Sequence, residues 1–270
     1  MCYDNIMDID IHFLGTGGAV GTAERDNTCF VIRRNRVLFL VECPGSVMAK
    51  FDRMGLDSRN VEGIFISHIH PDHVYGLPSF VHSHYETPRR VPLFGSRETV
   101  TFCRGLLEYF DLFREKIQFR THPVALSSKE SHAMDNGLTV MSIAVPHSSS
   151  SSAFLFHFPE EDIRLLYSGD TPPSAALLHE AGRVDVLLHD CSFPSRFLLD
   201  KPELATMHTD ALSLGKLAAD AGVKILFPCH LFSDFGFSPL EIEKEIRHSF
   251  SGRLVIPSDF ETVLLNTPLC

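Results

Sequence analysis

The feature that most constrains this chain is a group of His and Asp residues that directly follows an apolar run, residues 61–66. His68, His70, Asp72 and His73 fall within six residues. Because alternate residues of an extended chain point to the same side, His68, His70 and Asp72 are expected on one face, with His73 at the turn that follows. Imidazole and carboxylate groups are ligands for zinc, iron and manganese. This spacing predicts a metal site with enough ligands for two ions.

Four other apolar runs end in side chains of the same chemical type. The runs 138–145, 163–167, 184–188 and 224–228 lead into His147, Asp170, His189 with Asp190, and His230. In α/β proteins, ligand sites lie beyond the carboxyl ends of strands, and strands that run parallel present those ends at one edge of the sheet. The spacing alone leaves each of these residues open to two interpretations, as a metal ligand or as an ordinary turn or cap residue.

The distribution of apolar runs predicts a layered α/β fold with mixed sheets. Strands are expected at residues 9–14, 29–32, 37–41, 61–66, 138–145, 153–158, 163–167, 184–188, 224–228 and 253–256. Helices are expected at residues 46–54, 98–113, 210–221 and 240–248. Strands that cluster early and then alternate with helices are typical of layered α/β architecture. With 44% hydrophobic residues and neither a repeat nor a long linker, the sequence predicts one domain over residues 1–270.

Charge and cysteine content exclude several classes of protein. A formal net charge of −10 argues against nucleic-acid binding through overall charge, and no apolar run approaches the roughly 18 residues needed to cross a bilayer. Two basic runs, Arg33-Arg34-Arg36 and Arg89-Arg90, are interpreted as exposed loop tips; contact with a nucleic-acid backbone is the alternative if they share the metal edge. Seven irregularly spaced cysteines without a C-x-x-C pair, and an N-terminus unlike a secretory leader, predict reduced thiols and a cytoplasmic location.

Taken in order, these motifs resemble the metallo-β-lactamase superfamily. The H-x-H-x-D-H signature spans residues 68–73, and the glycine turn at residues 14–18 resembles the superfamily's opening strand and turn. The resemblance implies a four-layer αβ/βα sandwich with two divalent metal ions at one edge, zinc first, with manganese or iron as alternatives. It further implies that one ion is bound by His68, His70 and His147, that the second is bound by Asp72, His73 and His230, and that Asp170 bridges them.

Within that superfamily, the sequence is most similar to the RNase Z-like phosphodiesterases. The segments His189-Asp190-Cys191 and Met207-His208-Thr209 stand where that branch has its His-Glu-Ala-Thr and Gly-His-Ser motifs. This implies that Asp190 orients His208 near the leaving group and that Asp72 orients or deprotonates the attacking water. The function implied is that of a dinuclear metal-dependent hydrolase, a phosphodiesterase that uses a metal-bridging hydroxide.

Departures from the family pattern keep two phosphodiester substrates in view. The segment between His84 and Thr121 has no basic, Gly-rich arm of the kind that tRNA-processing members use, and residues 42–45 read Glu-Cys-Pro-Gly in place of Asp-Cys-Gly. The expected partner is therefore a phosphodiester substrate, either RNA at its 3′ end or a small cyclic or nucleotide phosphodiester. No membrane partner is expected, and a homodimer is left open. The alternatives are a hydrolase of another ester, lactone or thioester, and an iron-dependent redox or sulfur enzyme.

Overall fold

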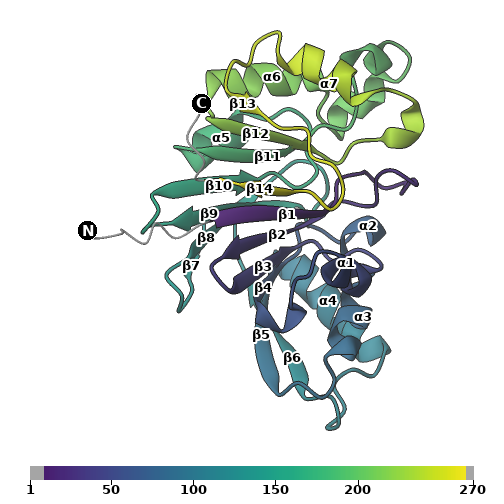
Figure 1. Ribbon diagram of the computed structural model, residues 1–270, viewed down its shortest axis with the longest axis vertical. Coiled ribbons are helices and arrows are strands. Elements are labelled where there is room, and N and C mark those ends of the chain that lie inside the picture. The colour runs from purple at the N-terminus through teal and green to yellow at the C-terminus, as the bar shows by residue number, and fades with distance from the viewer. Residues whose placement is uncertain (1–8, 266–270) are drawn as a thin grey trace.

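Two seven-stranded β-sheets face each other at the centre of the computed structural model, which describes residues 9–265 (Figure 1). The first sheet contains, in order, β14 (Thr262–Leu264), β1 (Ile9–Gly15), β2 (Cys29–Arg34), β3 (Val37–Val41), β4 (Val61–Phe65), β5 (Arg89–Gly95) and β6 (Phe119–Ala125). The second contains β13 (Arg253–Leu254), β12 (Ile225–Cys229), β11 (Val186–Asp190), β10 (Ile163–Tyr167), β9 (Ser152–Phe158), β8 (Thr139–Ala144) and β7 (Ser131–Ala133). Cys2 and Cys270 lie outside the described residues.

Helices cover the outer face of each sheet and complete four layers. The first sheet is accompanied by α1 (Val47–Arg53), α2 (Pro71–Val74), α3 (Leu77–Ser83) and α4 (Arg97–Tyr109), and the second by α5 (Ala175–Ala181), α6 (Ala211–Asp220) and α7 (Pro239–Ile246) (Figure 1). Short 3₁₀ turns lie at Ser58–Asn60, Ser195–Leu199, Pro202–Thr206 and Ser233–Phe235. The predicted αβ/βα sandwich is confirmed. Within residues 9–265, no helix is long and apolar enough to cross a membrane.

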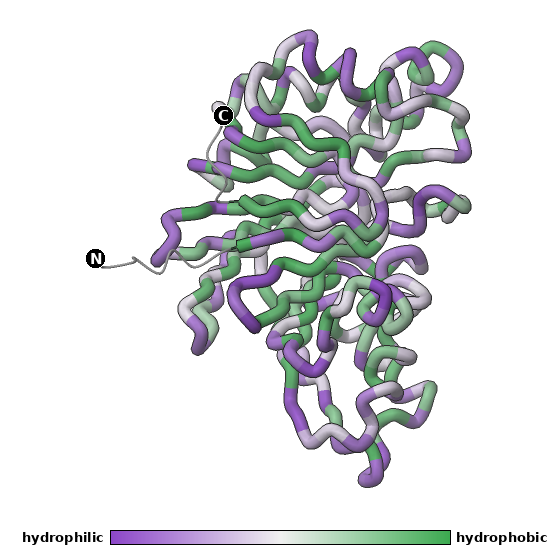
Figure 2. The backbone as a smooth tube through the Cα atoms, in the orientation of Figure 1, coloured by the Kyte–Doolittle hydropathy of each residue, from purple (hydrophilic) through white to green (hydrophobic). Residues whose placement is uncertain are grey.

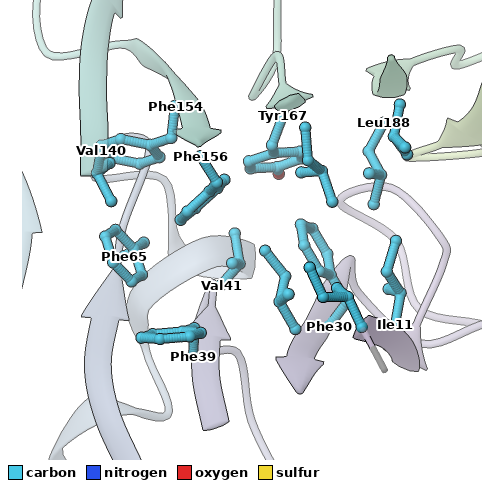
Figure 3. Close-up of a cluster of buried hydrophobic side chains, with 14 of the residues drawn as sticks. Ile11, Phe30, Phe39, Val41, Phe65, Val140, Phe154, Phe156, Tyr167 and Leu188 are labelled. Atoms are coloured by element: carbon cyan, nitrogen blue, oxygen red, sulfur yellow. The ribbon is translucent and has the colours of Figure 1, made fainter. Parts of the chain in front are cut away.

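Aromatic side chains fill the space between the two sheets. Phe65 is fully buried there, stacked on Phe94 with ring centroids 4.6 Å apart and packed edge-on against Phe156 at 4.9 Å. Figure 3 shows Phe65 and Phe39 from one sheet facing Phe154 and Phe156 from the other. The strands are accordingly the most continuously hydrophobic stretches of the backbone in Figure 2. Aromatic pairs at these separations add to the free energy gained by burial.

The directions of the strands bring their carboxyl ends to one edge. In the second sheet β10, β11, β12 and β13 are parallel, and β8 runs the same way because both β8 and β10 are antiparallel to β9. In the first sheet β3, β4, β5 and β6 are parallel. The segments that follow β4, β8, β10 and β12, and the last two residues of β11, carry the His and Asp residues identified in the sequence.

Several elements depart from the sequence predictions. The strands β5, β6, β7 and β14 and the helices α2, α3 and α5 were not expected. The helix expected at residues 98–113 ends at Tyr109, because Asp111 adopts a positive φ of 61° that an α-helix excludes. Its large aromatic side chains do not face the core: Phe102 is 40% and Tyr109 86% exposed, whereas the buried face holds Thr99, Val100, Cys103 and Leu107.

Candidate metal centre

A first group of ligand atoms gathers around His70. Its Nδ1 lies 2.9 Å from Nε2 of His68 and 3.3 Å from Nε2 of His147. His68 follows β4 and His147 follows β8, so this group joins the two sheets. Together with Asp170, these side chains place one ligand atom each within 4.8 Å of one another.

A second group gathers around Asp72. Its Oδ2 lies 3.3 Å from Nε2 of His73 and 3.4 Å from Nε2 of His230. His230 follows β12, whereas Asp72 and His73 lie in α2, which begins at Pro71. Figure 1 places α2 at the right-hand edge, beside the loop that follows β1.

Asp170 stands between the two groups. Its Oδ2 lies 3.8 Å from Nε2 of both His68 and His147, 3.4 Å from Nε2 of His73 and 3.2 Å from Nε2 of His230. The preceding Gly169 has a φ of 59°, and a Cβ at that position would lie 3.0 Å from Cβ of Ser67. A glycine is therefore needed to bring this loop so close to the segment that carries His68.

These residues fit a pair of metal ions. Two nitrogens bound to one tetrahedral zinc ion at about 2.0–2.1 Å are separated by about 3.3 Å, which matches the distance between Nδ1 of His70 and Nε2 of His147. Asp170 Oδ1 is buried and has no hydrogen-bond partner among residues 9–265, as expected for an oxygen that faces a cation. The donor set of imidazoles and carboxylates suits zinc, manganese or iron. The His/Asp groups are thus consistent with a dinuclear site.

The structure corrects one detail of the predicted geometry. An extended chain through His68, His70 and Asp72 would direct all three side chains to one group. In the structure β4 already ends at Phe65 and α2 starts at Pro71, so that Asp72 turns away from His70 and joins His73. The proline sets the first helical position, where its missing N–H costs no hydrogen bond.

Polar groups behind the imidazoles fix their orientation. Nδ1 of His68 pairs with Ser67 Oγ at 2.9 Å, and Nδ1 of His147 with the carbonyl oxygen of Met207 at 2.9 Å. Nδ1 of His230 lies 3.2 Å from Ser192 Oγ. Each contact leaves the other ring nitrogen directed into the cluster, the arrangement by which outer polar groups orient metal-binding histidines.

Glu42 is a buried residue of the site that sequence reasoning missed. It is fully buried, its Oε1 lies 3.4 Å from Nδ1 of His73, and its carboxylate accepts the Ser67 N–H at 3.3 Å. In the sequence it stands out only as a departure from a family motif. A carboxylate at the end of the buried strand β3 was nevertheless a usable signal, because a charged group is rarely buried without a partner.

The buried imidazoles and carboxylates of the site shift one another's pKa values. Burial lowers the pKa of His68 well below its ordinary value, with His73 adding to the effect, which favours the neutral imidazole that binds metal. Burial also acts against charge on Asp170 and His73. Their mutual attraction outweighs it, so the pKa of the Asp170 carboxyl is lowered, by His230 and His73, and that of His73 is raised, by Asp170 and Glu42.

His208 lies beside the cluster and is held by Asp190. Its Nδ1 is 2.9 Å from Asp190 Oδ2, and its ring stacks on that of His230 at 5.2 Å with an interplanar angle of 15°. Asp190 also accepts the Ser192 hydroxyl at 2.7 Å. Burial acts to lower the pKa of His208, but the neighbouring Asp190 outweighs it and the pKa is raised. The contact with Asp190 uses Nδ1, so Nε2 of His208 is free of the carboxylate that orients the ring.

Both arginine runs lie away from the metal edge. Arg34 ends β2, Arg36 lies in the turn before β3, and Arg89 begins β5; β3 and β5 run parallel to β4, so these positions lie at the ends opposite His68. The predicted exposed loop tip is confirmed at Arg36 but is wrong for Arg34, which is a buried strand residue. Arg34 pairs with Glu160 and Glu161 at 2.5 and 2.6 Å. The alternative in which these runs contact a substrate at the metal edge is therefore not supported.

Solved structures with this architecture define the class of protein. The metallo-β-lactamase fold protein YhfI from Bacillus subtilis superposes with a TM-score of 0.77 at 17% identity, covering 95% of this chain and 99% of that one. The short form of human tRNase Z, ELAC1, gives a TM-score of 0.75 at 18% identity, covering 94% and 98%. The chain is a metallo-β-lactamase fold protein with a His/Asp site of the kind that holds metal ions.

Sequence comparison narrows this class to a family. Ribonuclease Z from Methanosarcina acetivorans is 26% identical over 297 aligned residues, covering 91% of this chain and 94% of the relative. Residues 9–225 match the family model of the anti-Pycsar protein Apyc1. The chain belongs to the Apyc1 family.

Proposed function

We propose that this protein is a two-metal phosphodiesterase that opens the cyclic phosphodiester of a cyclic nucleotide. The observation that carries the proposal is the pairing of His208 with Asp190 directly beside the two ligand groups. The ribose oxygen leaves as a strongly basic alkoxide and needs a proton, whereas a lactone or thioester hydrolase has less use for such a donor. Membership of a family whose activity is cyclic-nucleotide degradation supports the same substrate class.

The seven ligand residues would hold the metals, and the remaining chemistry belongs to the chain's own side chains. When bound, two divalent ions activate water and neutralise phosphoryl oxygens. Asp72, whose side chain is 12% exposed, is placed to accept a proton from the attacking water. Contacts with His230 and His73 outweigh the effect of burial and lower the pKa of Asp72, which keeps the carboxylate ionised.

His208 completes the reaction by protonating the leaving group. As water attacks phosphorus and the P–O bond to the ribose breaks, the proton on Nε2 passes to the departing oxygen. The product is a nucleoside monophosphate with a free ribose hydroxyl. Asp190 stabilises the imidazolium before this transfer and fixes the ring by its bond to Nδ1.

A small substrate is favoured over RNA by the segment between His84 and Thr121. Most of it forms β5 and α4, with α4 packed against β5 and β6. The longest stretch left between these elements, residues 110–118, is too short for a long protruding arm, and the net charge of −10 disfavours a polyanion. Processing of RNA 3′ ends is the second candidate, because ribonuclease Z relatives cover nearly the whole chain.

One panel of substrates tests the proposal. Metal-reconstituted protein is incubated with a nucleoside 3′,5′-cyclic monophosphate, a precursor tRNA with a 3′ extension, and a carboxyl ester. We expect turnover of the cyclic nucleotide and its loss in Asp72→Ala, with the exposed Asp135→Asn as the matched control. Turnover of the precursor tRNA alone favours the second candidate, and turnover of the ester alone rejects phosphodiester chemistry. Bound iron with an oxygen-dependent activity identifies a redox enzyme instead.

A further inference from the structure

An aromatic cluster borders the candidate metal centre on the side of His208. Its members from the segments 193–197 and 232–237 contact one another at centroid distances of 5.2–6.4 Å; they are Phe193, Phe197, Phe232, Phe235 and Phe237. Phe193 is fully buried, whereas the other four rings are partly open to solvent. The catalytic scheme above uses none of them.

Phe232 is the member of this cluster that reaches the reacting groups. Its ring lies 5.0 Å from that of His208 and 5.4 Å from that of His230, edge-on to the first and at 61° to the second. It also covers Gly18, where a Cβ would come within 2.4 Å of its Cδ1. Only a glycine at position 18 therefore lets the ring lie this close to the turn after β1, without any positive φ being required.

The position of Phe232 is held from several sides. Its N–H donates to the carbonyl oxygen of Ser192 at 2.8 Å, and Phe235 packs against it at 5.2 Å. Lys201 in turn places its ammonium 4.4 Å above the ring of Phe235. A ring that is fixed in this way loses little conformational entropy when a flat ligand packs on it.

An exposed apolar side chain stands nearby. Met207 is 44% exposed, immediately precedes His208, and accepts the His147 Nδ1–H through its carbonyl oxygen at 2.9 Å. The residues beside His208 thus include the aromatic ring of Phe232 and the flexible thioether of Met207, whereas the ligand groups of the metal centre are polar. This combination suits a ligand that is charged at one end and flat and apolar at the other.

We propose that Phe232 forms the nucleobase subsite by stacking on the base of the cyclic nucleotide. The inference rests on the proposed function, because it assigns the part of that substrate which the metal centre does not hold. Stacking on an aromatic side chain is available to every base, since each has a π face. Phe232 would then select substrates that carry a base, while the neighbouring His208 protonates the leaving oxygen.

Two substrates that share one reacting bond test the subsite. The first is a nucleoside 3′,5′-cyclic monophosphate, and the second is the 1-O-methyl riboside 3′,5′-cyclic phosphate, which lacks the base. We expect the ratio of their kcat/KM values to fall by roughly 5- to 150-fold in Phe232→Leu, the range typical of base–aromatic stacking. Phe232→Tyr should restore most of the ratio. Phe237→Leu, in the same cluster but without contact to either histidine, should leave it unchanged.

The possible outcomes distinguish failure of the nucleobase subsite from failure of the proposed phosphodiesterase activity. Leucine fills much of the space over Gly18, and the melting temperature of each variant reports any loss of packing. If the wild-type protein cleaves both substrates equally well, or if Phe232→Leu keeps the wild-type ratio, the subsite is rejected while the phosphodiesterase stands. If neither substrate is cleaved, the proposed function fails and the subsite fails with it.

Discussion

In the proposed mechanism, His208 is the residue that distinguishes hydrolysis of a phosphodiester with a basic leaving group from hydrolysis that needs no acid. The demand for its proton rises with the basicity of the oxygen that departs. We expect His208→Ala to lower kcat for a cyclic nucleotide by about 10²- to 10⁴-fold. The loss should be much smaller for a 4-nitrophenyl phosphodiester, because nitrophenolate leaves without protonation.

Steady-state kinetics with both substrates measure this difference. His248→Ala, at an exposed position outside the site, is the matched control. Equal losses on the two substrates would show that His208 binds phosphate or orients neighbouring groups instead of acting as an acid.

The sequence revealed most of the residues of this site, because metal binding restricts the residue type and because these residues stand directly after apolar runs. His68 to His73 could be recognised from spacing, and His147, Asp170 and His230 from their places after apolar runs. The structure brings all seven together, although their role as ligands stays a prediction. Glu42 was missed because its role depends on burial beneath His73, a tertiary contact that spacing does not encode.

At the scale of elements, strand direction explains why residues so distant in sequence meet. Periodicity identified the buried strands of both sheets but missed β5 and β6, each of which contains a proline. Proline normally argues against a strand because it has no backbone N–H to donate in a hydrogen bond to the neighbouring strand. Pro92 is tolerated because β4 pairs with β5 only at Leu93 and Phe94, and Pro123 because β6 is the edge strand.

The strand β4 connects the core to the metal centre, and its last residue is Phe65. Phe65→Ala should lower the free energy of unfolding by about 3–5 kcal/mol, since it opens a cavity among fully buried rings. Phe65→Leu should cost less, because more of the volume is kept. Urea unfolding followed by circular dichroism measures both. A loss below about 1 kcal/mol for alanine would contradict the packing described between the sheets.

Asp185 lies where three parallel strands, β10, β11 and β12, begin, and its contribution to stability should depend on pH. Its carboxylate accepts the Arg164 N–H at 3.0 Å and pairs with Arg183 and Lys224 at 2.8 Å each. Burial acts to raise the pKa of Asp185, but these partners outweigh it and lower the pKa from 3.8. A lowered pKa gives stability that is present above the unfolded value and is lost as pH falls through the folded value.

We therefore expect Asp185→Asn to reduce the free energy of unfolding by about 1 kcal/mol at pH 7. The difference from wild type should shrink as pH falls below 3.8. Asp162→Asn removes an exposed partner of the same Arg183 and should change stability by less than about 0.5 kcal/mol. Denaturant titrations between pH 7 and pH 3 give the comparison. A difference that stays constant over this range would show that the charge on Asp185 does not contribute.

At the scale of the whole molecule, the candidate metal centre ties the two sheets together. Its ligands follow β4 in one sheet and β8, β10 and β12 in the other, so bound ions should stabilise the folded chain as a unit. Zinc at about 100 times its Kd should add about 2.7 kcal/mol to stability and raise the melting temperature. Chelation should reverse the rise.

Asp170→Asn should lose most of that rise, because its carboxylate lies within reach of both groups. Each variant is compared with its own metal-free form by differential scanning calorimetry, so that any effect of the substitution itself cancels. Asp135→Asn, remote from the cluster, serves as the control. The same zinc-induced rise in Asp170→Asn as in wild type would mean that the two groups do not share this residue.

The arginine-bearing turn between β2 and β3 lies at the rim opposite the ligand-bearing edge. The ion pairs that hold the β2–β3 hairpin to the second sheet are therefore far from the candidate metal centre. Arg34 clamps the hairpin to Glu160 and Glu161 of the other half, while the tip at Arg36 stays open to water. A fluorophore or surface tether attached at that turn would leave the edge with the metal ligands unobstructed. The turn is therefore a suitable site for immobilising the molecule.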